Sequence, residues 1–466
     1  MGSHRVAGAP LDFASLRAEL EVPGGFASDV LAEADRAAMQ VVLPDEDATD
    51  IPLVTVDPTG SRDLDQAVHI ARADVGYLVT YAVADVAAYV RPNSALDEEV
   101  QARAETLYFP DTRVPLHPPR ISEDAASLLP DQVRPAVLWR IALDDGGNVA
   151  DIDVRRARVR SRAQLDYVGL QNQLADGSAP DAVALLEQVG TLRQRLARQR
   201  HAINLDLPEQ RVEPGGLNGW TLVMREQLPV EQYNAEISLL TGMCAATLML
   251  AAGYGILRTV PPPQPGAVHA LQRAAKALGV DWPDGARPGD VLATVDRCNG
   301  RHVAFIEHAV SLLRGAAYTP FDGAPPPQQL HAGIGAPYAH VTAPLRRLVD
   351  RYGTEICLAT QGKAPVPKWV RDRMPELPAT MATGDHRAHL IDRAIVDATE
   401  AWLLYPRIGQ QFTATVIDAD ERAGTIVIDD PAVRARCDSA GLVIGESIQV
   451  RLTEADPIKH QVRFSV

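Results

Sequence analysis

The sequence has few cysteines, few aromatic residues and no recognisable leader. Only 4 of its 466 residues are cysteine, and they stand far apart with no Cys-x-x-Cys or Cys/His pair. Neither a zinc site nor a disulfide framework is therefore expected. The N-terminus lacks an apolar run between a basic start and a small-residue cleavage site, so we expect no signal peptide. These absences favour a protein of the reducing cytoplasm.

No apolar run is long and continuous enough to predict a membrane span. The longest, residues 237–257, is interrupted by Ser238, Thr241 and three glycines and directly follows Glu236. A span needs about 20 consecutive, predominantly apolar residues. We therefore expect a buried core helix here and no membrane partner.

Positive charge is also in deficit, because 45 Lys and Arg stand against 60 Asp and Glu, which gives a formal net charge of −15. Nucleic-acid binding depends on clustered cations, so this balance argues against a protein whose whole surface binds phosphate. It still allows one basic channel inside an acidic surface.

One local cluster of cations stands out against this deficit. Residues 155–162 hold five arginines on a predicted strand. Alternation would place four of them on one face, where they could follow a phosphate backbone: Arg156, Arg158, Arg160 and Arg162. The alternative is a solvated sheet face that pairs with acids such as Asp151 and Asp153.

The composition, 46% hydrophobic and 23% charged, is that of a globular protein, and the length predicts about three structural units. Residues 1–50 carry two short helical patterns, at 13–20 and 27–40, on either side of a Pro-Gly-Gly break. We interpret them as a packed helical arm, with a helix-turn-helix that binds duplex as the less favoured alternative.

Residues 51–400 mix strands and helices without a clear repeat and predict one large α+β domain. Strands are predicted at 53–57, 66–73 and 76–86, where Val, Tyr and Thr are frequent. Helices are best supported by apolar periodicity at 181–200, 230–252 and 345–361.

Residues 407–466 have a different pattern, with five short alternating strands separated by turn residues. Five strands in this length suit a small OB-type barrel, a common platform for single-stranded nucleic acid. An accessory barrel without a ligand is the alternative.

The most informative segment runs from Asp57 to Gln66 and reads DPTGSRDLDQ. It follows a predicted strand, and its Pro and Gly allow a tight loop that folds Asp57 back beside Asp63 and Asp65. Clustered carboxylates in a partly buried site need a counter-charge, and a hard cation such as Mg²⁺ is the usual one. That cation would neutralise a phosphate and activate water. The alternative is a solvated acidic turn.

A second segment, YAHVTAPLRRLVD at residues 338–350, carries the opposite charge. Thr342 ahead of Pro344 predicts a helix start with proline in the first turn, which would direct free backbone N–H groups toward an anion. Arg346 and Arg347 would bind phosphate oxygens and stabilise transition-state charge. A surface pair of arginines is the alternative.

Together the two segments resemble the ribonuclease II and ribonuclease R family, the RNB family of 3′→5′ exoribonucleases. Its catalytic domain opens with D-x(5)-D-x-D-D and closes with Y-x-H-x-T-S-P-(I/L)-R-R-x-x-D. Residues 81–136 and the segments VRSRAQLDYVGLQ, EQYNAEISLLTG, ILRTVPPP and AAYTP resemble the family in order. The resemblance covers about residues 51–400, and residues 407–466 resemble its S1-type RNA-binding barrel.

This resemblance implies a role for individual residues. Asp57, Asp63 and Asp65 match the metal-binding and catalytic aspartates, and Arg346 matches the arginine that supports the scissile phosphate. Further matches imply contacts with RNA, with Tyr108 near the 3′ end: Tyr108, Tyr167, Tyr338, His340, Thr342 and Arg347.

The sequence departs from the family pattern in four places. Gln66 replaces the fourth acid and brings no charge, although its amide oxygen can still act as a ligand. Ala343 replaces the serine before proline. The late glutamate has no secure equivalent, with Asp392 and Asp397 as candidates. The 50 N-terminal residues show helical patterns where the family has two cold-shock barrels.

The resemblance implies a metal-dependent 3′→5′ exoribonuclease that hydrolyses single-stranded RNA to nucleoside 5′-monophosphates. Asp57 and Asp65 would hold Mg²⁺, or Mn²⁺, with help from Gln66, while Asp63 orients a metal ligand or water. A monomer is expected. The alternatives are a catalytically weak RNA-binding relative and, less favoured, a DNA-directed exonuclease.

Overall fold

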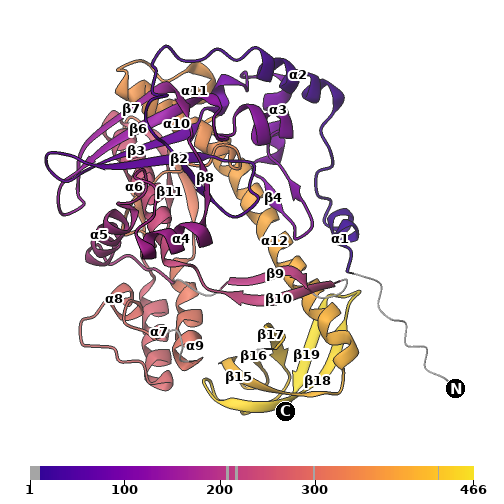
Figure 1. Ribbon diagram of the computed structural model, residues 1–466. Helices are drawn as coiled ribbons and strands as arrows, with labels where there is room; N and C mark the ends of the chain where they lie inside the picture. Colours follow the sequence, from indigo (N-terminus) through magenta and orange to yellow (C-terminus); the bar gives the residue numbers. More distant parts are fainter. Residues whose placement is uncertain (1–10, 206–208, 216–218, 297–299, 429) are drawn as a thin grey trace.

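The computed structural model describes residues 11–466 apart from 206–208, 216–218, 297–299 and 429. A body of sheet and helices lies at the top of Figure 1, with a helical cluster and a small barrel below it. Helix α12 (Leu377–Leu404) runs from the body to the barrel. The α+β class is confirmed.

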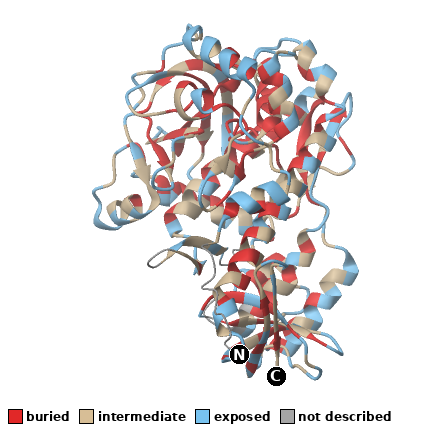
Figure 2. Cartoon of the chain, turned by 90° about the vertical axis from the view of Figure 1, so that its right-hand side faces the viewer, coloured by how far each residue is buried: buried red, intermediate tan, exposed pale blue. Residues whose placement is uncertain are grey.

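The main sheet of the body is antiparallel, in the order β2-β3-β6-β7. Its strands are β2 (Gln66–Arg72), β3 (Tyr77–Ala84), β6 (Val133–Leu143) and β7 (Val149–Arg160). β2 and β3 lie where the Val-, Tyr- and Thr-rich runs predict them. β3 is buried along almost its whole length, and buried residues gather in the interior of the body (Figure 2).

Two pairs of short strands flank this sheet and carry residues of interest. β1 (Thr55–Asp57) pairs in parallel with β8 (Gln164–Asp166), which opens directly into α4 (Tyr167–Asp176). β4 (Leu107–Tyr108) and β5 (Arg113–Val114) form a hairpin. Two single turns lie near these strands, η1 (Val86–Ala88) and η2 (Ile121–Ala125).

The predicted helices are present, with two later starts than predicted. They are α5 (Leu186–Gln199), α6 (Pro229–Ala252) and α10 (Leu348–Gln361). The other elements of the body are α3 (Ala95–Arg103), α11 (Lys368–Arg373), β11 (Tyr254–Thr259), β12 (Ala317–Asp322), β13 (Leu330–His331) and β14 (Ala336–Pro337).

Among the described residues, α6 is the one helix long and apolar enough to cross a membrane. It packs inside the body, against α5, α10 and β11. Its buried side chains include Ile237, Leu240, Cys244 and Met249. This packing agrees with the core helix predicted from the sequence.

A helical cluster packs around a second apolar core, to which Val260 of the segment after β11 and Ile417 of the barrel also contribute. It comprises α7 (Pro265–Leu278), α8 (Pro288–Leu292), α9 (Gly300–Ala309) and η3 (Val310–Leu313). Leu271, Phe305 and Ile306 lie at the centre of that core. The domain boundaries proposed from the sequence, 1–50, 51–400 and 407–466, stay a prediction.

The predicted C-terminal barrel is confirmed, and it closes in the order β15-β16-β17-β19-β18. Its strands are β15 (Gln411–Ala419), β16 (Gly424–Ile428), β17 (Val433–Cys437), β18 (Ser447–Asp456) and β19 (Gln461–Ser465). The turn η4 (Tyr405–Arg407) joins it to α12. Its apolar core includes Leu404 of α12 and Leu222 of the hairpin β9 (Glu209–Gly215) and β10 (Gly219–Arg225), so the barrel packs against both.

The N-terminal helices α1 (Phe13–Glu19) and α2 (Ser28–Met39) pack onto the body. Phe13 and Leu16 are buried in a cluster with Ile391 and Ile395 of α12. Arg17, a basic residue of this arm, forms an ion pair with Asp111 at 2.7 Å. The arm therefore has the packing role favoured over duplex binding.

Candidate active site

The loop from Asp57 to Asp65 has the tight form predicted from its sequence. Asp57 ends β1, Gly60 has a φ of +84°, which suits glycine, and the N–H of Ser61 donates to the carbonyl of Pro58 at 3.1 Å. The fully buried Leu64 anchors the far end, where its N–H donates to Ser127 Oγ at 3.0 Å. The loop thus returns Asp63 and Asp65 toward Asp57, whose carboxyl is influenced by the charge of Asp63.

Burial strongly disfavours the charge of two of these carboxylates. It raises the pKa of Asp57 to about 7, with a contribution from Asp63, although Arg346 opposes the change. It raises the pKa of Asp65, which is 4% exposed, to about 8. Asp57 Oδ2 is buried without a hydrogen-bond partner among the described residues. The site therefore has less positive charge around it than its carboxylates require.

The arginine segment meets these carboxylates, but not through a helix start at Thr342. That prediction was wrong, because α10 begins only at Leu348 and residues 344–346 form a turn. The freed N–H groups do bind anions, namely carboxylates of the same chain. The N–H of Leu345 donates to Asp65 Oδ1 at 2.7 Å, and that of Ala343 to Asp350 Oδ1 at 2.7 Å.

Arg346 and Arg347 have different surroundings. Arg346 Nε lies 3.7 Å from Asp65 Oδ2, and its side chain is 46% exposed, so its guanidinium faces both the carboxylates and solvent. Arg347 binds Asp350 through Nε and Nη2, at 2.8 and 2.9 Å. Arg346 is thus free to contact a phosphate, whereas Arg347 is already held by an acid.

The other site residues predicted in this segment, Tyr338, His340 and Thr342, contact side chains or backbone of the surrounding body. Tyr338 is buried, and its ring lies so close to Gly242 of α6 that a Cβ there would overlap it. His340 Nδ1 is 2.8 Å from the Tyr318 hydroxyl, and Thr342 Oγ1 is 2.9 Å from Ser238 Oγ. This burial favours a packing role for Tyr338 and Thr342; their contact with RNA stays a prediction.

The two other tyrosines predicted to contact RNA lie beside the carboxylates. Tyr108 is 48% exposed, and its hydroxyl lies near Asp63 and Arg346. Burial of the hydroxyl group and the charge of Asp63 raise the pKa of Tyr108 to about 12. Burial and then the charge of Asp57 raise the pKa of Tyr167, the first residue of α4. Tyr108 therefore presents an exposed ring beside the carboxylates, while the contact of either tyrosine with RNA stays a prediction.

Three of the four predicted arginines, Arg156, Arg158 and Arg160, lie on β7, whereas Arg162 follows the strand and donates to the carbonyl of Thr49 at 2.7 Å. Most of this row is engaged within the chain. Arg156 binds Asp85 and Glu355, and Arg158 binds Asp47 at 2.9 Å and two backbone carbonyls. These contacts favour the alternative of a face paired with acids, and Asp153, one of the acids proposed, binds the neighbouring Arg155 at 2.7 Å. Arg160 differs, because its Nε has no partner within the described residues.

Arg346 is not among the charges that act on either candidate for the late acid, Asp392 or Asp397. Both belong to α12, and burial raises the pKa of each. The charges that act on Asp392 are those of His389 and Glu209, and those on Asp397 are Arg393 and His460 of the barrel. Their assignment as partners of Arg346 stays a prediction that this placement does not favour.

Sequence reasoning missed Arg113, which binds Asp63 and Glu123. It stands opposite Tyr108 in the β4–β5 hairpin. The signal was present in the sequence, since Pro110-Asp111 between the two residues is a turn pair that would have placed them side by side.

The residues around this loop fit a divalent cation, even though they do not form a complete protein cage. No three His, Cys, Asp or Glu side chains gather into a metal-binding group in the described part of the chain. Mg²⁺ is commonly held by only one or two carboxylates, with waters and substrate phosphates completing its shell. The unpartnered Oδ2 of Asp57 and the buried carboxylate of Asp65 suit that arrangement.

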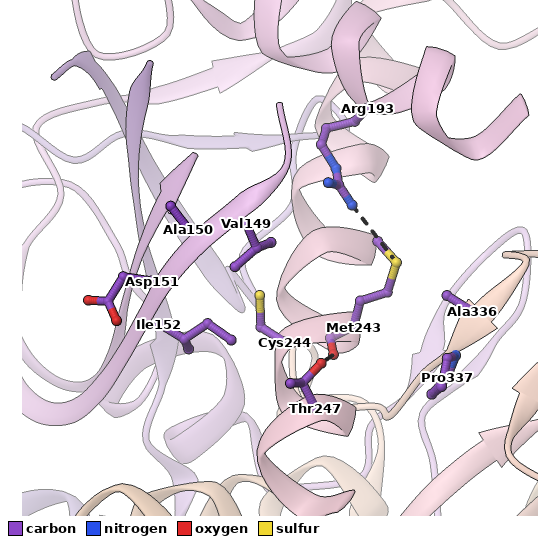
Figure 3. Close-up of a pocket in the computed structure, with 10 residues that line it drawn as sticks. All are labelled: Val149, Ala150, Asp151, Ile152, Arg193, Met243, Cys244, Thr247, Ala336 and Pro337. Atoms are coloured by element: carbon purple, nitrogen blue, oxygen red, sulfur yellow. Dashed lines mark hydrogen bonds between the residues drawn. The ribbon is translucent and has the colours of Figure 1, made fainter. Parts of the chain in front are cut away.

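A cavity of about 580 Å³ lies away from these residues, between the start of β7, α6 and β14 (Figure 3). Val149, Met243 and Pro337 are among the residues that line it, and none of the site residues predicted from the sequence does. Arg193 reaches it from α5, and its Nη1 donates to the carbonyl of Gly147 at 2.9 Å. The cavity is therefore distinct from the carboxylate site.

Comparison with known families agrees with this geometry. The model of the RNB domain matches residues 45–356, which include the aspartate loop, Arg346 and Arg347. The chain belongs to the RNB family. The model of the RNase II-type exonuclease C-terminal S1 domain matches residues 410–466, the closed barrel.

Individual relatives support this RNB assignment. The chain is 27% identical over 424 residues to "Exoribonuclease 2" of Enterobacter sp. (strain 638), covering 86% of this chain and 62% of that one. It therefore spans about three-fifths of that relative's length.

Solved structures share the RNB fold. RNase R of Mycoplasma genitalium in complex with ribose methylated single-stranded RNA matches with a TM-score of 0.87 and 19% identity, over 97% of this chain and 77% of that one. Yeast Ssd1, described as a pseudonuclease, matches with a TM-score of 0.70 and 17% identity, over 88% and 53%.

Proposed function

We propose that this chain is a metal-dependent 3′→5′ exoribonuclease that hydrolyses single-stranded RNA to nucleoside 5′-monophosphates. The observation that carries the proposal is the meeting of two buried carboxylates, Asp57 and Asp65, with the exposed guanidinium of Arg346 in an RNB domain. Buried carboxylates can hold a divalent metal ion, and a guanidinium that faces solvent can bind the phosphate. Metal-assisted phosphodiester hydrolysis uses both.

A bound divalent cation would neutralise the phosphate and lower the pKa of a water molecule. Asp57 and Asp65 are the carboxylates that would hold it, and the amide oxygen of Gln66 is the third candidate ligand. The side-chain nitrogen of Gln66 donates to the carbonyl of Thr342, so the side-chain oxygen of Gln66 points away from that carbonyl. Mg²⁺ is the metal we propose, with Mn²⁺ as the alternative.

The remaining groups act on the substrate. Arg346 would bind the scissile phosphate and offset the charge that develops on it, because it is exposed and only loosely paired with Asp65. Asp63, held by Arg113, would orient a metal ligand or water. The ring of Tyr108 would stack on a base near the 3′ end, in a way that does not depend on sequence.

Single-stranded RNA is the proposed substrate for two reasons. One matching RNase R structure holds ribose methylated single-stranded RNA, although a second structure of that protein holds double-stranded RNA. The C-terminal barrel also belongs to a type found in RNase II-type exonucleases. A DNA substrate is the alternative, which a matched RNA and DNA pair would distinguish through the 2′-hydroxyl.

A catalytically weak RNA-binding relative is the second candidate function. Gln66 in place of a fourth acid favours it, and Ssd1 shows that this fold also occurs in a pseudonuclease. The paired carboxylates and the exposed Arg346 argue for catalysis, because a protein that only binds RNA gains nothing from two buried acids that repel phosphate.

The two functions are separated by incubating the full chain with a 5′-labelled single-stranded RNA and Mg²⁺ or Mn²⁺. The proposal predicts shortening from the 3′ end and release of nucleoside 5′-monophosphates. The Asp65→Asn variant should bind the RNA but not shorten it. Binding without monophosphate release in both metals would support the second function and overturn the first.

We also propose a monomer that acts in the cytoplasm. Cys244, Cys357 and Cys437 are free in the described part of the chain, and cysteines without disulfides are usual in a reducing compartment. Light scattering should give the mass of one chain, and a dimer mass would contradict the proposal.

A further inference from the structure

Arg113 of β5 holds two acidic side chains at the edge of the candidate active site. It binds Asp63, whose side chain is 14% exposed. Its Nε and Nη2 also reach Glu123 Oε1, at 3.1 and 3.0 Å. The guanidinium, itself 26% exposed, therefore bridges the aspartate loop and the turn η2.

The elements on both sides of Arg113 are fixed. In the hairpin, Arg113 pairs with Tyr108, and the N–H of Phe109 donates to the carbonyl of Thr112 at 2.8 Å. On the other side, η2 is anchored by the buried Ile121 and Ser122. A planar guanidinium between two rigid elements keeps both carboxylates in place.

This arrangement changes how much negative charge is available to a metal. Of the four motif positions, Asp63 is bound by Arg113, whose single charge it shares with Glu123, and Gln66 carries no charge. Only Asp57 and Asp65 remain, and two carboxylates balance one divalent cation. A second cation would need further ligating carboxylates, as sites with two metals have.

We propose that Arg113 is a positioning residue that takes the place of a second divalent cation: by holding Asp63, and together with the neutral Gln66, it limits the site to one bound ion. The inference rests on the metal-dependent function proposed above. It adds that a side chain of this protein supplies a charge that a second metal would otherwise bring.

The test is a titration of the full chain with Mn²⁺, followed by electron paramagnetic resonance and without RNA. The wild type should bind one Mn²⁺. Arg113→Gln releases Asp63 and Glu123 as a pair of unbalanced carboxylates, so it should bind a second Mn²⁺. Arg113→Lys keeps the charge beside Asp63 and should return the count to one.

A matched control is available in Arg62, whose side chain is 63% exposed and lies 3.8 Å from Glu123. Arg62→Gln removes an equal positive charge from beside Glu123 without breaking a bond to Asp63, so it should bind one Mn²⁺. Circular dichroism of each variant confirms that the fold is intact before the titration is compared.

Several results would overturn the inference. These are two Mn²⁺ in the wild type, no Mn²⁺ in the wild type, a count of one in a folded Arg113→Gln variant, or a second ion in Arg62→Gln as well. Weaker RNA binding by Arg113→Gln with an unchanged Mn²⁺ count would mean that Arg113 contacts phosphate instead. Hydrolysis is measured separately, so a wild type that binds one Mn²⁺ but releases no monophosphate refutes the function and not the role of Arg113.

Discussion

Replacing Asp65 with Asn should stabilise the metal-free protein while it abolishes hydrolysis. Burial raises the pKa of Asp65 from its ordinary 3.8 to about 8, so holding it ionised costs free energy of folding. Asparagine has the same shape, and its oxygen can accept the bond from the N–H of Leu345, now 2.7 Å from Asp65 Oδ1. It carries no charge to bury.

The size of the effect follows from the pKa difference. About four pKa units at 1.36 kcal/mol each give a ceiling of about 5 kcal/mol. Loss of the attraction to Arg346 and relaxation of the loop reduce this, so we expect a gain of about 2 kcal/mol in the free energy of unfolding at pH 8.

The pH dependence has a defined sign. Because the folded state binds the Asp65 proton more tightly than the unfolded state, the wild type loses stability as the pH rises from about 4 to about 8. The variant lacks this contribution, so its advantage should grow across the same window. Mg²⁺ should raise the stability of the wild type more than that of the variant, because binding to the folded state stabilises it.

The assay is urea unfolding in EDTA at pH 5 and pH 8, repeated with Mg²⁺. Asp63→Asn is the matched control, since it makes the same chemical change in the same loop but leaves Arg113 without one of its carboxylates. It should destabilise the protein. An Asp65→Asn variant less stable than the wild type at pH 8 in EDTA would refute the reasoning.

Three further predictions concern RNA binding and the sheet. Tyr108→Ala should weaken single-stranded RNA binding in fluorescence anisotropy by about 1–3 kcal/mol, whereas Tyr108→Phe keeps the stacking ring and should bind normally. Arg156→Met should lower the free energy of unfolding by about 2 kcal/mol in urea, because it leaves the buried carboxylates of Asp85 and Glu355 without their cation. The loss should be smaller than for a fully buried ion pair, because the Arg156 side chain is partly exposed. Arg160→Gln should reduce the slope of RNA affinity against salt by about 1, while Arg158→Gln, already paired with Asp47, should leave it unchanged; equal slopes for both variants would argue against a phosphate contact by Arg160.

The sequence predicted the features that are local. The aspartate loop could be predicted because Asp57, Asp63 and Asp65 lie within nine positions, on either side of a glycine that takes a positive φ. The barrel strands and α6 could be predicted because their apolar residues recur at the regular spacing of strands and of a helix.

Long-range contacts explain what the sequence could not predict. Residues 344–346 form a turn ahead of α10, and the N–H of Leu345 in that turn binds Asp65, which is 280 positions away. The arginines of β7 looked free because their acids come from distant segments, such as Glu355 beside Arg156. Such pairings depend on the tertiary fold and leave no spacing in the sequence.

The central claim is that Asp57, Asp65 and Arg346 form the site of a metal-dependent 3′→5′ exoribonuclease. The most direct test is chromatography of the products that the wild type releases from single-stranded RNA in Mg²⁺, with Asp65→Asn as the paired sample. The account predicts nucleoside 5′-monophosphates from the wild type and intact RNA from the variant. Equal release by both proteins, or none from the wild type in Mg²⁺ or Mn²⁺, would contradict it.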